Sequence, residues 1–178
     1  MSGTIGGTGA AAIVCAHEGV RYFGRGVWDA YLRWLGEEPE WEPSDAMRWG
    51  TRLESAILDW YIEEQRPGYV LTRGLRLTDG WMHGSFDALA VHPDGYAVIV
   101  DAKRSAITRL LEEWGTPEEP RAPLGYQVQL AWYGLLAERA GYRILSCDLA
   151  IYDPIADGEG REAGHIRAFR WSVVRPLA

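Results

Sequence analysis

Cysteine is scarce in this chain, with only Cys15 and Cys147 among 178 residues. Two thiols exclude a disulfide framework, and they also exclude a four-cysteine zinc or iron–sulfur site within one chain. Two buried, reduced thiols are the expected interpretation. No apolar run approaches the roughly 18 residues of a membrane-spanning helix, and the first residues carry no basic leader. We therefore expect a cytoplasmic protein without membrane association.

Positively charged residues are also few: the chain has 18 lysines and arginines against 25 acidic residues, which gives a net charge of −7. This balance argues against a generally basic, non-specific nucleic-acid binder. It does not exclude a DNA enzyme, since carboxylates that bind cations count as acidic here and are neutralised in the loaded site. Neither an internal repeat nor a low-complexity linker interrupts the chain, so we expect a single domain over residues 1–178.

Hydrophobic periodicity and turn residues predict helices around one continuous block of strands. Ser44 is expected to cap a long helix that Pro67-Gly68 ends, and Thr8 is expected to cap a short one. The pattern predicts an α/β or α+β domain with a mixed sheet. The expected helices are 10–15, 27–35, 45–65, 107–114 and 125–140, and the expected strands are 69–72, 75–77, 81–91, 97–103, 145–152 and 165–173.

The long helix carries a glutamate within its apolar stripe. Glu54 follows Gly50 by four residues and precedes Leu58 by four, so it shares their face of the helix. A carboxylate on a buried face needs a cation or hydrogen-bond donors, because burying it alone is costly. Two explanations stay open: a salt bridge to an arginine such as Arg76, or a metal site.

A hairpin brings two further acids together. The turn at residues 92–96 sets a register in which Asp87 falls opposite Asp101. Directly opposed residues have Cβ atoms about 4.5–5.5 Å apart, and two carboxylates at that distance repel unless a positive charge lies between them. Lys103 follows Asp101 by two residues and therefore projects from the same face of the strand.

Acids and a lysine in this arrangement suit a metal-dependent hydrolysis. Hard oxygen ligands favour Mg²⁺ or Mn²⁺ over zinc. Such ions activate a water and stabilise the leaving oxygen when a phosphodiester is cleaved, and a lysine can hold the attacking water. The alternative is a surface Asp–Lys pair, which contributes little to stability.

Several short segments carry a family resemblance in their order and spacing, which covers residues 5–173. They are IGGTGAAAI at 5–13, WGTRLE at 49–54, GSFDAL at 84–89, VDAK at 100–103, YQVQ at 126–129 and YDP at 152–154. The chain resembles the YqaJ/lambda-exonuclease family of phage-type recombination nucleases, within the PD-(D/E)xK superfamily. It departs from the family pattern where Phe86 replaces the usual proline and Asp101 replaces the commoner glutamate.

The resemblance implies a role for each residue of the acid–lysine set. Asp87 and Asp101, with the backbone carbonyl of Ala102, would hold the main metal ion. Glu54 would help to hold a second ion, and Lys103 would position the attacking water. We therefore expect Mg²⁺ or Mn²⁺, with two ions in each active site.

The resemblance also implies contacts around this centre. Gln127 would act beside the metals as a catalytic residue, with Gln129 the less favoured choice for that position and a candidate DNA contact. Thr8 would bind a DNA phosphate at the head of a helix. Each arginine of a DNA-lining set also has a simpler reading as a solvated surface charge. These arginines are Arg48, Arg52, Arg73 and Arg104.

The activity implied is a Mg²⁺-dependent exonuclease that degrades duplex DNA ends in the 5′→3′ direction for recombination. A homotrimeric ring around the DNA and a single-strand annealing protein as partner are implied by the same resemblance. Two alternatives stay open: an endonuclease or single-strand nuclease on the same core, and a catalytically degenerate protein that only binds DNA.

Overall fold

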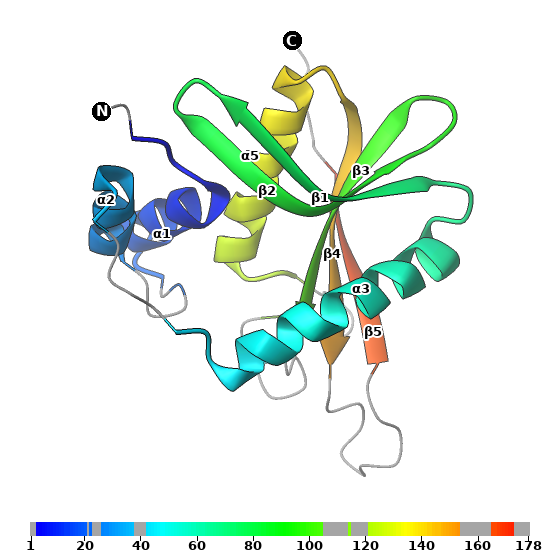
Figure 1. Cartoon of the computed structure of the whole chain (residues 1–178), viewed down its shortest axis with the longest axis horizontal. Coiled ribbons are helices and arrows are strands. Elements are labelled where there is room, and N and C mark those ends of the chain that lie inside the picture. The colour runs from blue at the N-terminus through cyan, green and yellow to red at the C-terminus, as the bar shows by residue number, and fades with distance from the viewer. Residues whose placement is uncertain are drawn as a thin grey trace.

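The computed structural model describes residues 3–20, 22, 26–37, 42–104, 114, 121–153 and 165–172, which form a mixed β-sheet with flanking helices (Figure 1). This architecture confirms the predicted α+β class. Among the described helices, none is long and apolar enough to cross a membrane. The elements are α1 (Gly7–His17), α2 (Val27–Leu35), α3 (Asp45–Gln65), β1 (Val70–Asp79), β2 (Met82–Val91), β3 (Tyr96–Arg104), α5 (Leu124–Arg139), β4 (Arg143–Asp153) and β5 (His165–Ser172).

The five strands lie in the sheet in the order in which they occur along the chain. Neighbours are antiparallel except for β3 and β4, which are parallel. A parallel pair needs a long crossover connection, and α5 lies in the segment that provides it. Helix α5 therefore lies between β3, the strand that carries Asp101 and Lys103, and the parallel strand β4.

Helices α3 and α5 cover opposite faces of the sheet (Figure 1). On one face Leu58 and Tyr61 of α3 pack with Val98 and Val100, and on the other face Ile99 packs with the apolar side of α5. Strand β3 is therefore buried on both sides. That burial explains its continuous apolar sequence.

The predicted bounds of α2 and α3 agree with the structure. Ser44 caps α3 as expected, since its Oγ accepts a hydrogen bond from the backbone N–H of Met47 at 3.4 Å. The predicted cap of α1 is wrong: the helix begins at Gly7, Gly6 is its N-cap, and no side chain caps it. Thr8 already lies in the first turn, because the Gly6 carbonyl accepts from the N–H of Ala10. Apart from Trp114, the predicted helix 107–114 lies outside the described residues.

The two strands predicted on either side of Gly74 are one strand. Strand β1 continues through this glycine, which has a φ of +62°. Pairing with β2 holds on both sides of it, with Arg73 opposite Ala88 and Leu75 opposite Phe86. The long partner strand β2 continues the pairing past this left-handed residue.

Candidate active site

The hairpin register agrees with the sequence prediction. The N–H of His92 donates to the Tyr96 carbonyl at 2.8 Å, and the β2–β3 pairs run from Val91–Ala97 to Ala88–Val100. Asp87 and Asp101 are the next residues along the two strands. There the side chain of Asp87 takes over from the backbone pairing, since its Oδ2 accepts the N–H of Ala102 at 2.8 Å.

Strand β2 is irregular at Asp87. Phe86 packs into the core under α5, whereas Ala88, two residues further on, packs into the core under α3. Residues two apart in a regular strand share a face, so the alternation shifts by one at Asp87. On the N-terminal side of Asp87, β2 and its partner β1 diverge from β3, β4 and β5 (Figure 1). Asp87 therefore lies at a fork in the sheet.

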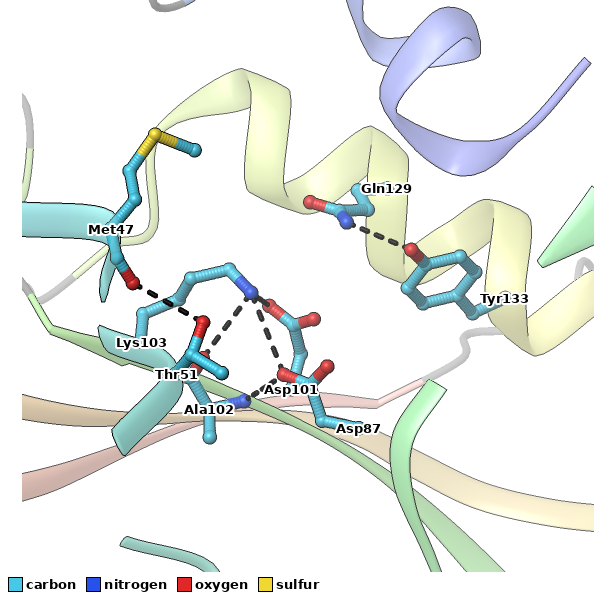
Figure 2. A network of polar contacts seen from close by, with 8 residues as sticks. All are labelled: Met47, Thr51, Asp87, Asp101, Ala102, Lys103, Gln129 and Tyr133. Carbon is cyan, nitrogen blue, oxygen red and sulfur yellow. Dashed lines mark hydrogen bonds and ion pairs between the residues drawn. The ribbon is translucent and has the colours of Figure 1, made fainter. Parts of the chain in front are cut away.

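Lys103 places its ammonium between three oxygens at this fork (Figure 2). Its Nζ lies 2.6 Å from Asp101 Oδ2 and 3.6 Å from Asp87 Oδ2, and it donates to the Ala102 carbonyl at 3.3 Å. Asp101 is 2% exposed, and within the described residues its Oδ2 has this ion pair but no well-directed hydrogen bond. Lys103 is also the only lysine in the whole chain.

The charges of the acids and the lysine are strongly coupled. Burial raises the pKa of Asp101 to about 7, with Lys103 opposing the rise and Asp87 adding to it. Burial lowers the pKa of Lys103, but attraction to Asp101 and Asp87 outweighs that effect and raises the pKa above its ordinary value. Lys103 therefore stays charged, and Asp101 binds a proton more readily than an ordinary aspartate does.

Glu54 lies near this centre but not inside it. Burial raises the pKa of the half-buried Glu54, repulsion by Asp87 adds to the rise, and Lys103 and Arg73 lower it. In the part of the chain that the structure describes, Glu54 forms no ion pair, with Arg76 or any other residue. Nor do three acidic, histidine or cysteine side chains converge there as a ready-made metal site.

The apolar stripe of α3 is buried only in part. Ile57, Leu58 and Tyr61 are fully buried, whereas Met47 is 44% exposed. The first turns of α3 extend past the edge of the strands (Figure 1), so no sheet covers Met47. Glu54 lies between the exposed turns and the buried ones, which leaves its carboxylate half-covered beside the fork.

Helix α5 brings Gln129 and Tyr133 to the same side of the sheet as the acids (Figure 2). The buried amide of Gln129 donates to the Tyr133 hydroxyl at 2.9 Å. Burial raises the pKa of Tyr133 to about 12, and the charge of Asp101 adds to the rise. Gln127 instead donates to the Ala122 carbonyl at 2.6 Å. The geometry therefore favours Gln129 over Gln127 beside the acids, while the role of each residue stays a prediction.

Tyr133 is a site neighbour that is absent from the predicted site residues, because an aromatic side chain is usually expected to pack in the core. It does pack, against Phe86 with ring centroids 4.9 Å apart, but its hydroxyl also faces the charged centre. The signal that points to it is its spacing of four residues from Gln129, which places both side chains on one face of α5.

The other residues predicted to contact DNA are spread over the surface. Thr8 is half-buried in the first turn of α1, and Arg104 is exposed at the end of β3. Arg73 is held by an ion pair and by a hydrogen bond to Ser55, which favours the reading of a structural surface charge. The partners are Asp45 for Arg48, the Trp49 ring for Arg52 and Asp59 for Arg73.

The domain is an α+β domain whose mixed sheet forks at paired acids beside a lysine. Comparison with known proteins identifies the family to which it belongs. The chain belongs to the YqaJ-like viral recombinase domain family, whose model matches residues 2–140. This result confirms the resemblance seen in the sequence. Among curated protein sequences, none matches the chain.

Solved structures show the same fold. The alkaline exonuclease LHK-Exo from Laribacter hongkongensis superposes with a TM-score of 0.56 at 17% identity, over 96% of this chain and 79% of the other. Its complex with dAMP gives a TM-score of 0.60 with the same identity and coverage. A phage-related exonuclease from Haemophilus somnus 129PT gives 0.53 at 13% identity, over 84% of this chain and 67% of the other.

Proposed function

We propose that this protein is a metal-dependent deoxyribonuclease that acts as an exonuclease on duplex DNA ends. The observation that carries the proposal is the cluster of three oxygens, from Asp87, Asp101 and Ala102, around the Lys103 ammonium. Membership of a recombinase family and the exonuclease names of the similar structures support it.

The residues present fit a divalent cation. Two carboxylates and one carbonyl already surround a positive charge, and hard oxygen donors of this kind are the ligands of Mg²⁺ and Mn²⁺. Asp87, Asp101 and the Ala102 carbonyl would hold the first ion, and Glu54 would help to hold a second. Bound ions would supply Lewis acidity and lower the pKa of a water.

The protein's own groups then orient the reaction. The Ala102 N–H holds Asp87 Oδ2 at 2.8 Å, so this carboxylate keeps one orientation at the fork. The Lys103 ammonium would hold the attacking water and neutralise charge that develops on the phosphate. Gln129 and Tyr133 border the centre from α5 and would limit how the scissile phosphate can lie.

Three finer parts of the proposal rest on the family resemblance. They are degradation in the 5′→3′ direction, a homotrimeric ring around DNA, and cooperation with a single-strand annealing protein. A ring would also reconcile DNA binding with a net charge of −7, because only the residues that line the channel need to be basic.

The direct test is digestion of linear duplex DNA labelled separately at its 5′ and 3′ ends, with Mg²⁺ or with EDTA. The wild type is compared with Asp101→Asn and with Asp94→Asn, a matched control on the exposed turn of the same hairpin. We expect Mg²⁺-dependent loss from the 5′ end, retained in Asp94→Asn and reduced at least a hundredfold in Asp101→Asn.

Other outcomes would replace the proposal. Nicking of closed circular DNA without resection of ends would identify an endonuclease on the same core. Retention of cleavage on every DNA form by Asp101→Asn would place the chemistry elsewhere. Absence of cleavage by the wild type with both Mg²⁺ and Mn²⁺ would leave a DNA-binding protein.

A further inference from the structure

We propose that a buried polar network between the end of α3 and the sheet positions Glu54 for metal binding. The network consists of Tyr61 and Arg66, at the C-terminal end of α3, and Ser146 and Asp148 of β4. This inference rests on the proposed function, because it assigns these four residues a role in the geometry of that same site. They are positioning residues, because they are proposed to act through α3, which carries Glu54, and not on the metal or the substrate.

Tyr61 and Arg66 converge on one carboxylate. The Tyr61 hydroxyl donates to Asp148 Oδ2 at 2.5 Å, and Arg66 Nε donates to the same hydroxyl at 3.0 Å. The Arg66 guanidinium also donates to Asp148 Oδ2 at 2.7 Å and to Ser146 Oγ at 3.2 Å. All four residues are buried, with Asp148 and Tyr61 at 0% exposure.

Stability alone does not explain this network. Removing two charges from water costs roughly as much as their attraction returns, and apolar residues of similar volume are often as stabilising. Ile57 and Leu58 already supply apolar contacts on the same helix. The hydrogen bonds of the network hold α3 in one position on the sheet. Apolar contacts tolerate small sliding movements, whereas hydrogen bonds depend strongly on distance and angle.

The network fixes the part of α3 that carries the glutamate. Tyr61 follows Glu54 by seven residues, which is close to two helical turns, so both lie on one face about 10.5 Å apart along the axis. At the end of the helix, the Arg66 guanidinium also lies 5.8 Å from the Tyr69 ring, just before β1. A slide of the helix would move Glu54 by the same distance as Tyr61.

The other end of the network is anchored beside the acids. Asp148 is paired with Val100 in the parallel β3–β4 register, and Val100 directly precedes Asp101. The hydrogen bonds from α3 to Asp148 therefore connect α3, which carries Glu54, to β4. Strand β4 is the neighbour of β3, which carries Asp101. The two halves of the proposed metal site are held in register through the sheet.

The test is a double-mutant cycle on Mn²⁺ affinity, measured by titration calorimetry on the full chain. It compares the wild type, Tyr61→Phe, Glu54→Gln and the double variant. We expect Tyr61→Phe to weaken Mn²⁺ binding about tenfold, at the lower end of the losses caused by outer-sphere substitutions. In the Glu54→Gln background it should cause no further loss, because its effect acts through that carboxylate.

Leu58→Ala is the matched control, since Leu58 is fully buried on the same helix and lies outside the network. It should destabilise the fold more than Tyr61→Phe does and still bind Mn²⁺ within about twofold of the wild type. Tyr61→Phe keeps the Arg66–Asp148 ion pair, so it should fold, and near-ultraviolet circular dichroism will verify this.

Three results would overturn the inference. They are unchanged Mn²⁺ affinity in Tyr61→Phe, additive losses in the double variant, and an equal loss of affinity in Leu58→Ala. Cleavage assays on these proteins and on Asp101→Asn separate this outcome from failure of the proposed function. If Asp101→Asn still abolishes cleavage while the cycle is additive, the nuclease stands and the positioning role falls.

Discussion

Gly74 and Asp87 face each other across the β1–β2 pair, and both depart from regular strand geometry at this point. Gly74 has a φ of +62°, and the side-chain alternation of β2 shifts at Asp87. The pairs on either side, Arg73–Ala88 and Leu75–Phe86, keep their register. The irregularity is therefore confined to one position, and there it turns the Asp87 carboxylate toward the N–H of Ala102.

Replacing Gly74 with alanine should destabilise the protein by about 1–2 kcal/mol, the cost of a left-handed conformation for a residue with a Cβ. No atom lies within 4 Å of the added Cβ, so the cost comes from the backbone and not from a clash. Urea denaturation measures it. Gly50→Ala is the control: it lies within α3, also with open space around it, and should stabilise the protein by about 0.5–1 kcal/mol. Equal effects of the two substitutions would refute the backbone explanation.

Lys103→Arg should fail to replace lysine although it keeps the positive charge. The ammonium directs its compact set of donors at three oxygens, whereas a guanidinium is planar and directs its donors outward in a fork. We expect a loss of nuclease activity of at least a hundredfold in both Lys103→Arg and Lys103→Ala. Arg76→Lys, an exchange at an exposed position of β1, should leave cleavage rates unchanged. Near-normal cleavage by Lys103→Arg would mean that charge alone suffices.

The pKa of Asp101 makes the stability of the protein depend on pH in a defined direction. Its folded pKa is raised from 3.8 to about 7, so in this range the folded state binds more protons than the unfolded state. The stabilisation from this group is complete below pH 4 and is lost as the pH rises through 7. Thermal unfolding in EDTA from pH 4 to 8 should show a decline that Asp101→Asn reduces, with the raised pKa of Glu54 contributing the remainder. The same slope in both proteins would contradict the assignment.

The two cysteines should be inert in the native protein. Burial raises the pKa of Cys147 to about 12, with Asp148 and Glu138 adding to the rise, and burial also raises the pKa of Cys15. The thiolate is the reactive form, so a thiol-specific reagent at pH 8 should label neither residue within minutes. After unfolding in guanidinium both should react. Rapid labelling of the native chain would show that one of the two sites opens.

The local parts of this fold were predictable because local chemistry determines them. Ser44 and Pro67-Gly68 delimit α3, and the five-residue turn sets the register that brings Asp87 to Asp101. The start of α1 was not predictable in this way. Its N-cap is Gly6, which has no capping side chain. Thr8 is a better capping residue by type, so the sequence pattern favours it over the residue that the structure uses.

The arrangement around the acids depended on tertiary structure. Gln127 and Gln129 occur in one motif, but two residues are about 200° apart on a helix, and only the packing of α5 decides which one faces the sheet. Helical spacing indicated that Glu54 is on the buried face, while the extension of α3 past the strands left it half-covered. The left-handed Gly74 within a continuous strand likewise depends on the pairing with β2.

Seventeen of the eighteen basic residues of this chain are arginines, and the single lysine is the one that lies between the acids. An isotope label carried by lysine alone can therefore report on the centre of the protein with no other side chain labelled. Growth on ¹³C,¹⁵N-lysine would place that label on Lys103 without a chemical step that its raised pKa would slow. The resulting resonance would report the charge and surroundings of Lys103 during metal and DNA titrations, so this molecule carries a spectroscopic handle at the point where its chemistry is proposed to occur.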